Sequence, residues 1–157
     1  MELDRLRYSA DNCSIARTLD LVGEKWTLLV LREAFYGIRR FEDFHSAIGC
    51  ARNVLSARLG KLVANGILER RPYREPGRRA RSEYRLTAKG LELQPVLMAL
   101  MEWGDRWRAD ATGPPVRVRH RDCGAEVNVE LRCQEGHAVS SAGETYVTPG
   151  PGALEAA

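Results

Sequence analysis

The sequence predicts a mainly α-helical domain with one small β-hairpin, an α+β fold, followed by a small β-rich C-terminal extension. Apolar residues recur at helical spacing in four segments before residue 66 and in one longer segment after residue 87. Between these segments, two short β-prone runs flank a turn rich in Gly, Pro and Arg. After Gly113-Pro114-Pro115 the pattern changes to short alternations of apolar and polar residues, which are typical of small strands.

The first three helices are predicted from apolar spacing and from the glycines between them. The first begins at Cys13 and has one apolar face, whereas 24–35 is apolar on most sides and is expected to be buried. A short third helix follows Arg39-Arg40 and carries apolar residues at i, i+3 and i+7, namely Phe41, Phe44 and Ile48.

The third and fourth helices are predicted to form a winged helix-turn-helix together with the hairpin. Gly49 marks a tight turn, and the apolar residues of 52–65 then share one helix face. Two helices joined by a short turn with Gly, the second polar on its outward face, are typical of a helix-turn-helix. The hairpin runs 67–71 and 83–86 carry a long basic tip, which is the expected wing. The outward residues of the fourth helix are Arg52, Asn53, Ser56 and Lys61.

The positive charge is concentrated in the predicted wing. The chain of 157 residues has a net charge of only +3. Residues 1–112 carry 20 basic against 15 acidic side chains, and residues 113–157 carry 4 against 6. Within 67–90, eight basic side chains face three acidic ones, a net of +5. Such a local excess indicates a polyanionic partner, and the alternative is an ordinary solvated face.

A long last helix is predicted from Thr87 to about Arg108, with a bend at Pro95. Its apolar stripe, which ends with Trp103 and Trp107, exceeds what the core of four short helices needs. We therefore expect a homodimer formed through the N-terminal region and the helix 88–108. The alternative is that the stripe packs on the core of its own chain.

Four parts of the chain are expected: an N-terminal arm at 1–12, a DNA-binding and dimerisation domain at 13–112, a β-rich tail at 113–145 and a disordered end at 146–157. The 44% of hydrophobic and 29% of charged residues are typical of a soluble globular protein. No apolar run approaches the roughly 18–20 residues that span a membrane, and the N-terminus lacks the apolar core of a signal peptide. A cytoplasmic location is expected.

The chain resembles the HxlR-type family of bacterial transcription regulators. The resemblance is carried by Cys13 at the first helix, GEKWTLLVLREAFYGIRRFEDF at 23–44, VLSARLGKLVANGILERRPY at 54–73 and EYRLTAKGLELQPVLMALMEWG at 83–104. It covers about residues 13–110 and implies a winged-helix homodimer that binds operator DNA and regulates nearby genes. The chain departs from the family at Cys50-Ala51, where Ala51 removes the expected N-cap of the fourth helix, at a typical cost of about 0.5–2 kcal/mol. Cys50 is expected to fill a small buried site.

The fourth helix is expected to enter the major groove, and the wing to contact phosphates or the adjacent minor groove. Arg and Asn side chains can make bidentate bonds to guanine and adenine edges, which suits a recognition helix. The helix candidates are Arg52, Asn53, Ser56 and Lys61. The wing candidates for phosphate contact, which add affinity more than sequence choice, are Arg74, Arg78, Arg79 and Arg81. DNA binding is not expected to require a cofactor.

Cys13 is the candidate sensor of oxidants, because the resemblance implies this role for a cysteine at its position in several family members. A thiol at a helix N-terminus is also biased toward the thiolate, and Arg17 lies one turn on. The alternative is a small packing residue that never reacts.

The tail carries two pairs of candidate metal ligands. His120 and Cys123 precede Gly124, and nine residues separate them from Cys133 and His137. Four such ligands in two close pairs suit a tetrahedral zinc site, which would hold together strands too short to build a core. The alternatives are a Cys123–Cys133 disulfide and a tail that simply packs on the main domain.

Two other functions compete with DNA binding. An enzyme with Cys13 as nucleophile and a histidine base is disfavoured, because the sequence shows no group to orient such a pair, no phosphate loop and no paired carboxylates. No catalytic residue is therefore predicted. The second alternative is a winged-helix module that contacts protein instead of DNA, and its binding would be insensitive to salt.

Overall fold

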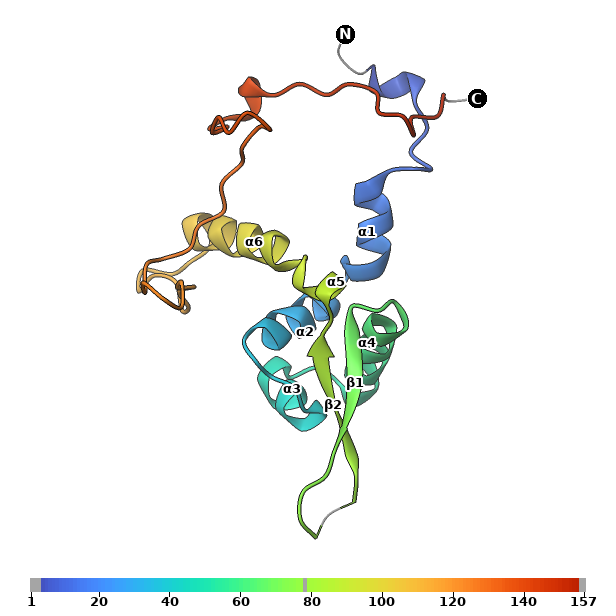
Figure 1. Ribbon diagram of the computed structural model, residues 1–157, viewed down its shortest axis with the longest axis vertical. Coiled ribbons are helices and arrows are strands. Elements are labelled where there is room, and N and C mark those ends of the chain that lie inside the picture. The colour runs from blue at the N-terminus through green and yellow to red at the C-terminus, as the bar shows by residue number, and fades with distance from the viewer. Residues whose placement is uncertain (1–3, 78, 156–157) are drawn as a thin grey trace. The chain divides into compact units, whose positions relative to one another are not determined.

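The computed structural model describes residues 4–77 and 79–155, and confirms a mainly helical fold with a two-stranded hairpin (Figure 1). The chain divides into two compact units, Thr18–Leu97 and a second that combines Met1–Arg17 with Met98–Ala157. The first unit contains the predicted helix-turn-helix and the hairpin. The second contains the predicted tail.

The four N-terminal helices lie close to their predicted positions. A glycine follows closely after each of the first three: Gly23, Gly37 and Gly49. The helices are α1 (Ser14–Val22), α2 (Lys25–Phe35), α3 (Phe41–Ile48) and α4 (Arg52–Ala64). Gly49 adopts a left-handed conformation (φ 70°) at the end of α3, which turns the chain sharply toward α4. The predicted helix-turn-helix is therefore α3, this turn and α4.

The hairpin consists of β1 (Leu68–Tyr73) and β2 (Arg81–Leu86), paired antiparallel with Leu68 opposite Leu86 and Tyr73 opposite Arg81. Figure 1 shows its strands beside α2, α3 and α4, with the connecting tip extending away from the helices. The backbone N–H of Tyr84 donates to the carbonyl of Arg39 at 2.8 Å, which ties β2 to the segment before α3. The wing is thereby fixed to the helix-turn-helix.

The predicted long last helix is wrong, because the structure breaks it into α5 (Ala88–Leu91) and α6 (Gln94–Trp107). Pro95 occupies the first turn of α6, where its missing N–H has no partner to lose and its fixed φ suits a helix start. The proline therefore begins a new helix instead of bending a continuous one. Thr87 caps α5 by accepting a hydrogen bond from the N–H of Gly90 at 3.1 Å.

A single hydrophobic core holds the first unit together. Phe44 of α3 is fully buried and its ring meets that of Tyr84 from β2 edge to face, at 6.4 Å between centroids. Cys50 is buried in the same cluster, as its small side chain predicted. The other buried apolar members come from α1, α2, α4, β1 and the residue before β1: Val22, Val30, Leu31, Leu55, Leu59, Leu62, Leu68 and Ile67.

The tail forms two small turns instead of the small strands expected between Val116 and Val139. Isolated antiparallel bridges join Arg119 to Glu126 and Arg132 to Ala138. A short 3-10 helix, η2 (Ala142–Glu144), follows them, and another, η1 (Arg5–Arg7), lies near the N-terminus. Between the ends of the described chain, the N–H of Ser9 donates to the carbonyl of Leu154 at 2.8 Å.

Candidate nucleic-acid interface

The start of α4 has the lost cap that its sequence implied. Ala51 occupies the N-cap position and makes no side-chain hydrogen bond to the helix. The helix nevertheless begins there, since the N–H of Leu55 donates to the carbonyl of Ala51 at 3.0 Å. Burial of Leu55, Leu59 and Leu62 fixes which face of α4 meets the core. The first turn is therefore held by packing, and its outward face points to solvent.

Three of the four predicted helix residues lie on that exposed face: Arg52, Asn53 and Ser56. Ala57 is also exposed, and Gly60 has open space where a Cβ would stand. Sequence reasoning missed Ala57 and Gly60, although both continue the i+4 spacing from Asn53 and Ser56. Because these side chains are small, another molecule can approach the backbone of α4 closely on this face.

Lys61, the fourth predicted helix residue, is placed elsewhere. Lys61 follows Arg52 by nine residues, which is about two and a half turns of helix, so it lies on the opposite side of α4. Its ammonium donates to the carbonyl of Asp20 at 2.6 Å and lies 4.0 Å from the carboxylate of Glu24. The structure therefore does not bring Lys61 together with the other three candidates.

Arg52 is held by a carboxylate of α3. Its two terminal nitrogens donate to both oxygens of Glu42 at 2.6 and 2.7 Å, and its guanidinium lies 5.0 Å from the centre of the Phe41 ring. The hydrogen bonds from Arg52 hold the pKa of Glu42 below its ordinary value and raise the pKa of Arg52. Both side chains are exposed, so the pair presents a positioned guanidinium that a stronger anionic partner can take over.

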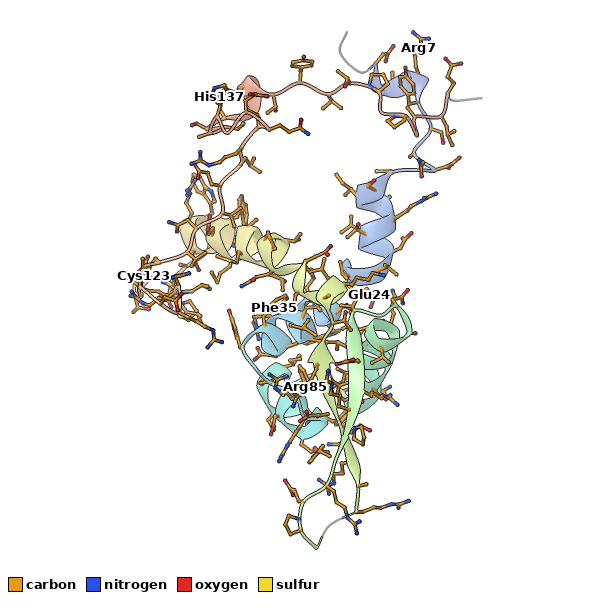
Figure 2. The ribbon with its side chains drawn as sticks, viewed as in Figure 1. Arg7, Glu24, Phe35, Arg85, Cys123 and His137 are labelled. Atoms are coloured by element: carbon orange, nitrogen blue, oxygen red, sulfur yellow. The ribbon has the colours of Figure 1, made fainter. Side chains whose placement is uncertain are left out.

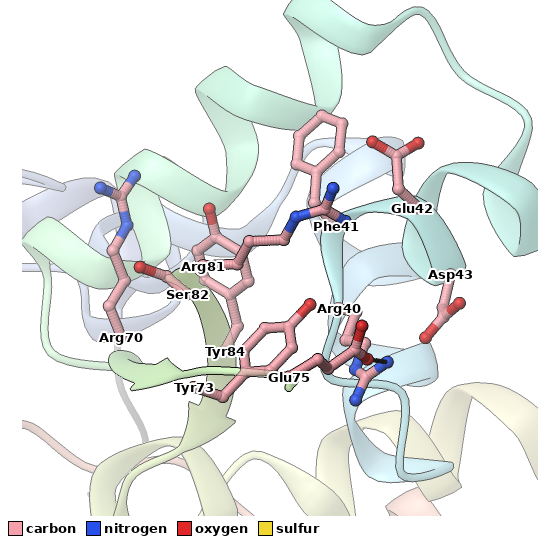
Figure 3. A pocket seen from close by; sticks show the side chains of 10 residues that line it. All are labelled: Arg40, Phe41, Glu42, Asp43, Arg70, Tyr73, Glu75, Arg81, Ser82 and Tyr84. Carbon is pink, nitrogen blue, oxygen red and sulfur yellow. Dashed lines mark hydrogen bonds and ion pairs between the residues drawn. The ribbon is translucent and has the colours of Figure 1, made fainter. Parts of the chain in front are cut away.

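A hollow lies between α3 and the hairpin (Figure 3). Phe41 and Glu42 line one side, and Arg81 and Tyr84 come from β2. The charge of Arg81 contributes to the lowered pKa of Glu42, which also receives the hydrogen bonds of Arg52. Arg52 thus bonds directly to Glu42, and Arg81 acts on the same carboxylate only through its charge.

The base of the wing is braced by a second arginine of the same hollow. Arg40, directly before α3, donates to Glu75 at 2.8 Å and lies 4.6 Å from the centre of the Tyr73 ring (Figure 3). These contacts join the segment before α3 to the end of β1. Cationic stacking on an aromatic ring adds about 0.5–1 kcal/mol at exposed sites, so Arg40 supports the direction in which the tip leaves the domain.

The wing tip itself presents exposed arginines. Arg74, Arg79 and Arg81 are exposed, and none of them forms an ion pair within 4.0 Å with any residue that the structure describes. Arg78, the fourth predicted wing residue, lies outside the described residues. Guanidinium groups without carboxylate partners are available to phosphates, which they bind in bidentate geometry.

Cys13 is half-buried directly before α1, and its carbonyl accepts the N–H of Arg17 at 3.0 Å. It therefore occupies the position from which α1 begins, as predicted. Ile15 and Leu19, one turn apart on α1, are 72% and 55% exposed. On α6 a second exposed apolar stripe runs at i, i+4, i+7 and i+11: Val96, Leu100, Trp103 and Trp107.

The four tail candidates are exposed and fall into two pairs. His120 lies beside Cys123, and Cys133 beside His137, but within residues 4–77 and 79–155 no three potential ligands gather as a metal site. No disulfide joins the cysteines of the described chain. Among the helices that the structure describes, none is both long and apolar enough to cross a membrane.

Comparison with known proteins identifies the family. Residues 21–112 match the HxlR-like helix-turn-helix family. An uncharacterized HTH-type transcriptional regulator of Mycobacterium tuberculosis is 40% identical over 152 residues, which are 97% of this chain and 95% of the relative. The crystal structure of PA1607, a proposed transcription factor, is 36% identical with a TM-score of 0.77, and the match covers 88% of this chain and 95% of that one.

A further similar structure is the redox regulator HypR in its oxidised form. It is 30% identical with a TM-score of 0.57, over 62% of this chain and 100% of that chain. All three carry the name of a transcription factor or regulator. The resemblance seen in the sequence is confirmed: the chain belongs to the HxlR-like helix-turn-helix family and is a transcription regulator of that class.

Proposed function

We propose that the protein is a homodimeric, sequence-specific repressor that binds operator DNA through α4 and the wing. The observation that carries the proposal is the exposed face of α4 beside wing arginines that have no carboxylate partner among the described residues. Arg52, Asn53 and Ser56 would contact base edges and nearby phosphates from the major groove. Arg74, Arg79 and Arg81 would contact phosphates, and we assign Arg78 to the same role from its sequence alone.

The proposed contact of Arg52 requires an exchange of partners. Its guanidinium is bonded to both oxygens of Glu42 in the structure, at 2.6 and 2.7 Å. The O6 and N7 acceptors of guanine match the same fork of donors, so binding would replace one bidentate contact by another. Glu42 would then remain beside Arg81, whose positive charge limits the cost of releasing it.

The homodimer is supported by the two exposed apolar stripes. Soluble monomers rarely expose contiguous apolar patches of large side chains. The stripe on α6 includes two tryptophans that are 61% and 66% exposed, and α1 adds Ile15 and Leu19. We assign these faces to a second copy of the chain, because the family resemblance implies a dimer. Two wings and two recognition helices would then face two operator half-sites.

We also propose that Cys13 makes DNA binding sensitive to oxidants. Its place at the start of α1 favours the thiolate, which is the reactive form. The similarity to the redox regulator HypR over the winged-helix part supports the same idea. Since α1 is one of the two proposed dimer faces, oxidation of Cys13 would change how the two copies pack. That change would alter the distance between the two recognition helices.

DNA binding is tested with the protein's own upstream intergenic DNA and a random duplex of the same length, by fluorescence anisotropy. We expect the parent to prefer the upstream DNA by at least about a thousandfold. Arg52→Ala should reduce that preference by about 1–3 kcal/mol, whereas Arg106→Ala on α6 should leave it unchanged. Equal binding to both duplexes by the parent would overturn sequence-specific binding, and salt-insensitive capture of a protein would favour the rival module.

A reporter that is silenced by the parent and active without it supports repression.

The sensor is tested by adding diamide and then a reductant to the complex with upstream DNA. We expect diamide to release the parent and the reductant to restore binding. Cys13→Ser should stay bound in diamide, and the buried Cys50→Ala should behave like the parent. Release of Cys13→Ser by diamide would assign the response to another group.

A further inference from the structure

We propose that the tail binds one Zn²⁺ per chain through four ligands, His120, Cys123, Cys133 and His137. The inference does not depend on DNA binding. It begins with the distances inside each pair: 3.4 Å between Cys123 Sγ and His120 Nδ1, and 3.5 Å between Cys133 Sγ and His137 Nδ1. Zinc bonds of about 2.3 Å to sulfur and 2.0–2.1 Å to nitrogen, at tetrahedral angles, place these two ligand atoms about 3.6 Å apart. Each pair thus has the spacing of one edge of a zinc tetrahedron.

The two pairs are built on similar backbone turns, of which the first is one residue longer than the second. In the first turn, the N–H of His120 donates to the carbonyl of Ala125 at 2.9 Å, and that of Gly124 to the carbonyl of His120 at 2.9 Å. In the second, the N–H of Cys133 donates to the carbonyl of His137 at 3.0 Å, and that of Gly136 to the carbonyl of Cys133 at 2.9 Å. A sequence that forms such a turn twice within 20 residues positions four ligands, two at a time.

The glycine and an arginine complete both turns. Gly124 and Gly136 have φ values of 70° and 83°, a region that favours glycine because it has no Cβ. The arginine before the first ligand donates to the carbonyl of that glycine: Arg119 to Gly124 at 2.9 Å, and Arg132 to Gly136 at 2.8 Å. The turns are therefore fixed by bonds that involve neither sulfur nor imidazole, which leaves the ligand atoms available to a metal.

The two turns differ by one residue in length and in where the second ligand stands: Gly124 is the fourth residue after His120, and Gly136 is the third after Cys133. Cys123 comes immediately before its glycine, whereas His137 comes immediately after. The spacings, His-x2-Cys and Cys-x3-His, therefore differ in sequence, although each turn pairs one sulfur with one imidazole. Figure 2 labels Cys123 in the first turn and His137 in the second. In both, the sulfur and the imidazole are exposed.

The metal would join the two turns. The connecting residues 124–132 can extend over about 30 Å, at roughly 3.3 Å per residue, or fold back on themselves. Residues 116–139 are almost all exposed, with Leu131 at 65%, so no apolar core holds the turns in place. A segment of this size without a core commonly depends on a structural metal. Neutral imidazoles and two thiolates leave the bound Zn²⁺ with no net charge, which suits a site of this kind.

The proposal is tested on the full chain, purified without chelator and loaded with Zn²⁺. Elemental analysis should find about one zinc per chain. Cys123→Ser and Cys133→Ser should each lose it, because the site needs both turns, whereas Cys13→Ser and Cys50→Ala should retain it. Co²⁺ in place of zinc should give the intense ligand-field bands of a tetrahedral sulfur-ligated ion, and these should vanish in the same two variants.

The proposal would be overturned by no stoichiometric Zn²⁺ after loading, by equal Zn²⁺ content in the four cysteine variants, or by a Cys123–Cys133 disulfide in the protein as isolated. Loss of half of the metal in a single-turn variant would also contradict it, because it would mean that each turn binds its own ion. Circular dichroism of every variant should retain the helical signal, since the helices lie outside residues 116–139. Failure of DNA binding in a zinc-loaded protein would leave the metal site standing and overturn only the proposed function.

Discussion

The winged-helix unit and the tail achieve order by different means. Thr18–Leu97 buries Phe44, Leu31, Leu55, Leu59 and Leu62 completely, so its helices and hairpin are held by a hydrophobic core. In the tail large apolar side chains are exposed, including Leu131 at 65% and Val127 at 36%. Its order rests on a few backbone and arginine hydrogen bonds within each turn.

The winged-helix unit and the tail also differ in how far they are shared with similar proteins. The match to HypR covers 62% of this chain, while those to the mycobacterial relative and to PA1607 cover 97% and 88%. The winged-helix unit thus occurs without a tail of this length in at least one similar structure. Because the two regions do not share a core, a change in one should leave the stability of the other almost unaltered.

The largest expected effect comes from the core. Phe44→Ala should lower the free energy of unfolding of the winged-helix unit by about 3–5 kcal/mol, because the ring is fully buried against Tyr84. Leu131→Ala in the tail should change it by less than about 0.5 kcal/mol. Urea denaturation followed by circular dichroism measures both. Similar losses in the two variants would show that the tail and the unit share a core after all.

Two glycines of the winged-helix unit should respond to alanine with opposite signs. A Cβ at Gly90 would collide with the carbonyl of Ile67, so Gly90→Ala should destabilise the unit by about 1–3 kcal/mol. A Cβ at Gly60 meets nothing, so Gly60→Ala should stabilise α4 by about 0.5–1 kcal/mol. The same denaturation experiment compares them. Loss of stability in Gly60→Ala would mean that the exposed face of α4 is covered.

Removal of the metal should loosen the tail and leave the stability of the winged-helix unit unchanged. A strong chelator should accelerate trypsin cleavage between Arg117 and Arg132 about tenfold or more, because each turn would lose the bond to the other. The melting temperature of the winged-helix unit should stay within a degree or so of its original value. Cys123→Ser should cleave at the fast rate with or without chelator. Unfolding of both regions on chelation would refute their independence.

A smaller effect is expected at the interface itself. Glu42→Gln removes the carboxylate that holds Arg52, so it should tighten binding to every duplex by a few fold, that is, by less than about 1 kcal/mol. Glu92→Gln, an exposed change at the end of α5, is the matched control and should leave affinity unaltered. Anisotropy titrations at one salt concentration suffice. Weaker binding by Glu42→Gln would mean that Glu42 orients Arg52 toward DNA instead of competing for it.

Much of the fold was predictable because local signals agree with the core. Gly49 places the turn, and the leucines of α4 fix its buried face, so the helix-turn-helix followed from spacing alone. The break between α5 and α6 was missed, because an apolar stripe continues across it and only the preference of Pro95 for a first turn reveals it.

The site was predictable in its residue types and less so in its partners. Arg52, Asn53 and Ser56 follow from the face opposite the leucines, yet Lys61 was grouped with them because a linear list ignores the half-turn between positions 52 and 61. Glu42 was not foreseen as the partner of Arg52, since its ten-residue separation has no local signature. Both ligand pairs of the tail were visible in the sequence, but the arginine hydrogen bonds that build their turns were not foreseen.

The most direct test of the central claim is the salt dependence of binding to the upstream DNA, compared between the parent and Arg74→Ala with Arg79→Ala. We predict that affinity falls steeply with salt for the parent. In the double variant the slope of log K against log salt should be shallower by about 1.8 per wing, since each lost phosphate contact removes about 0.9. Affinity for specific and random DNA should fall alike. An unchanged slope and unchanged affinity would contradict the account, because the wing would then make no contact with DNA.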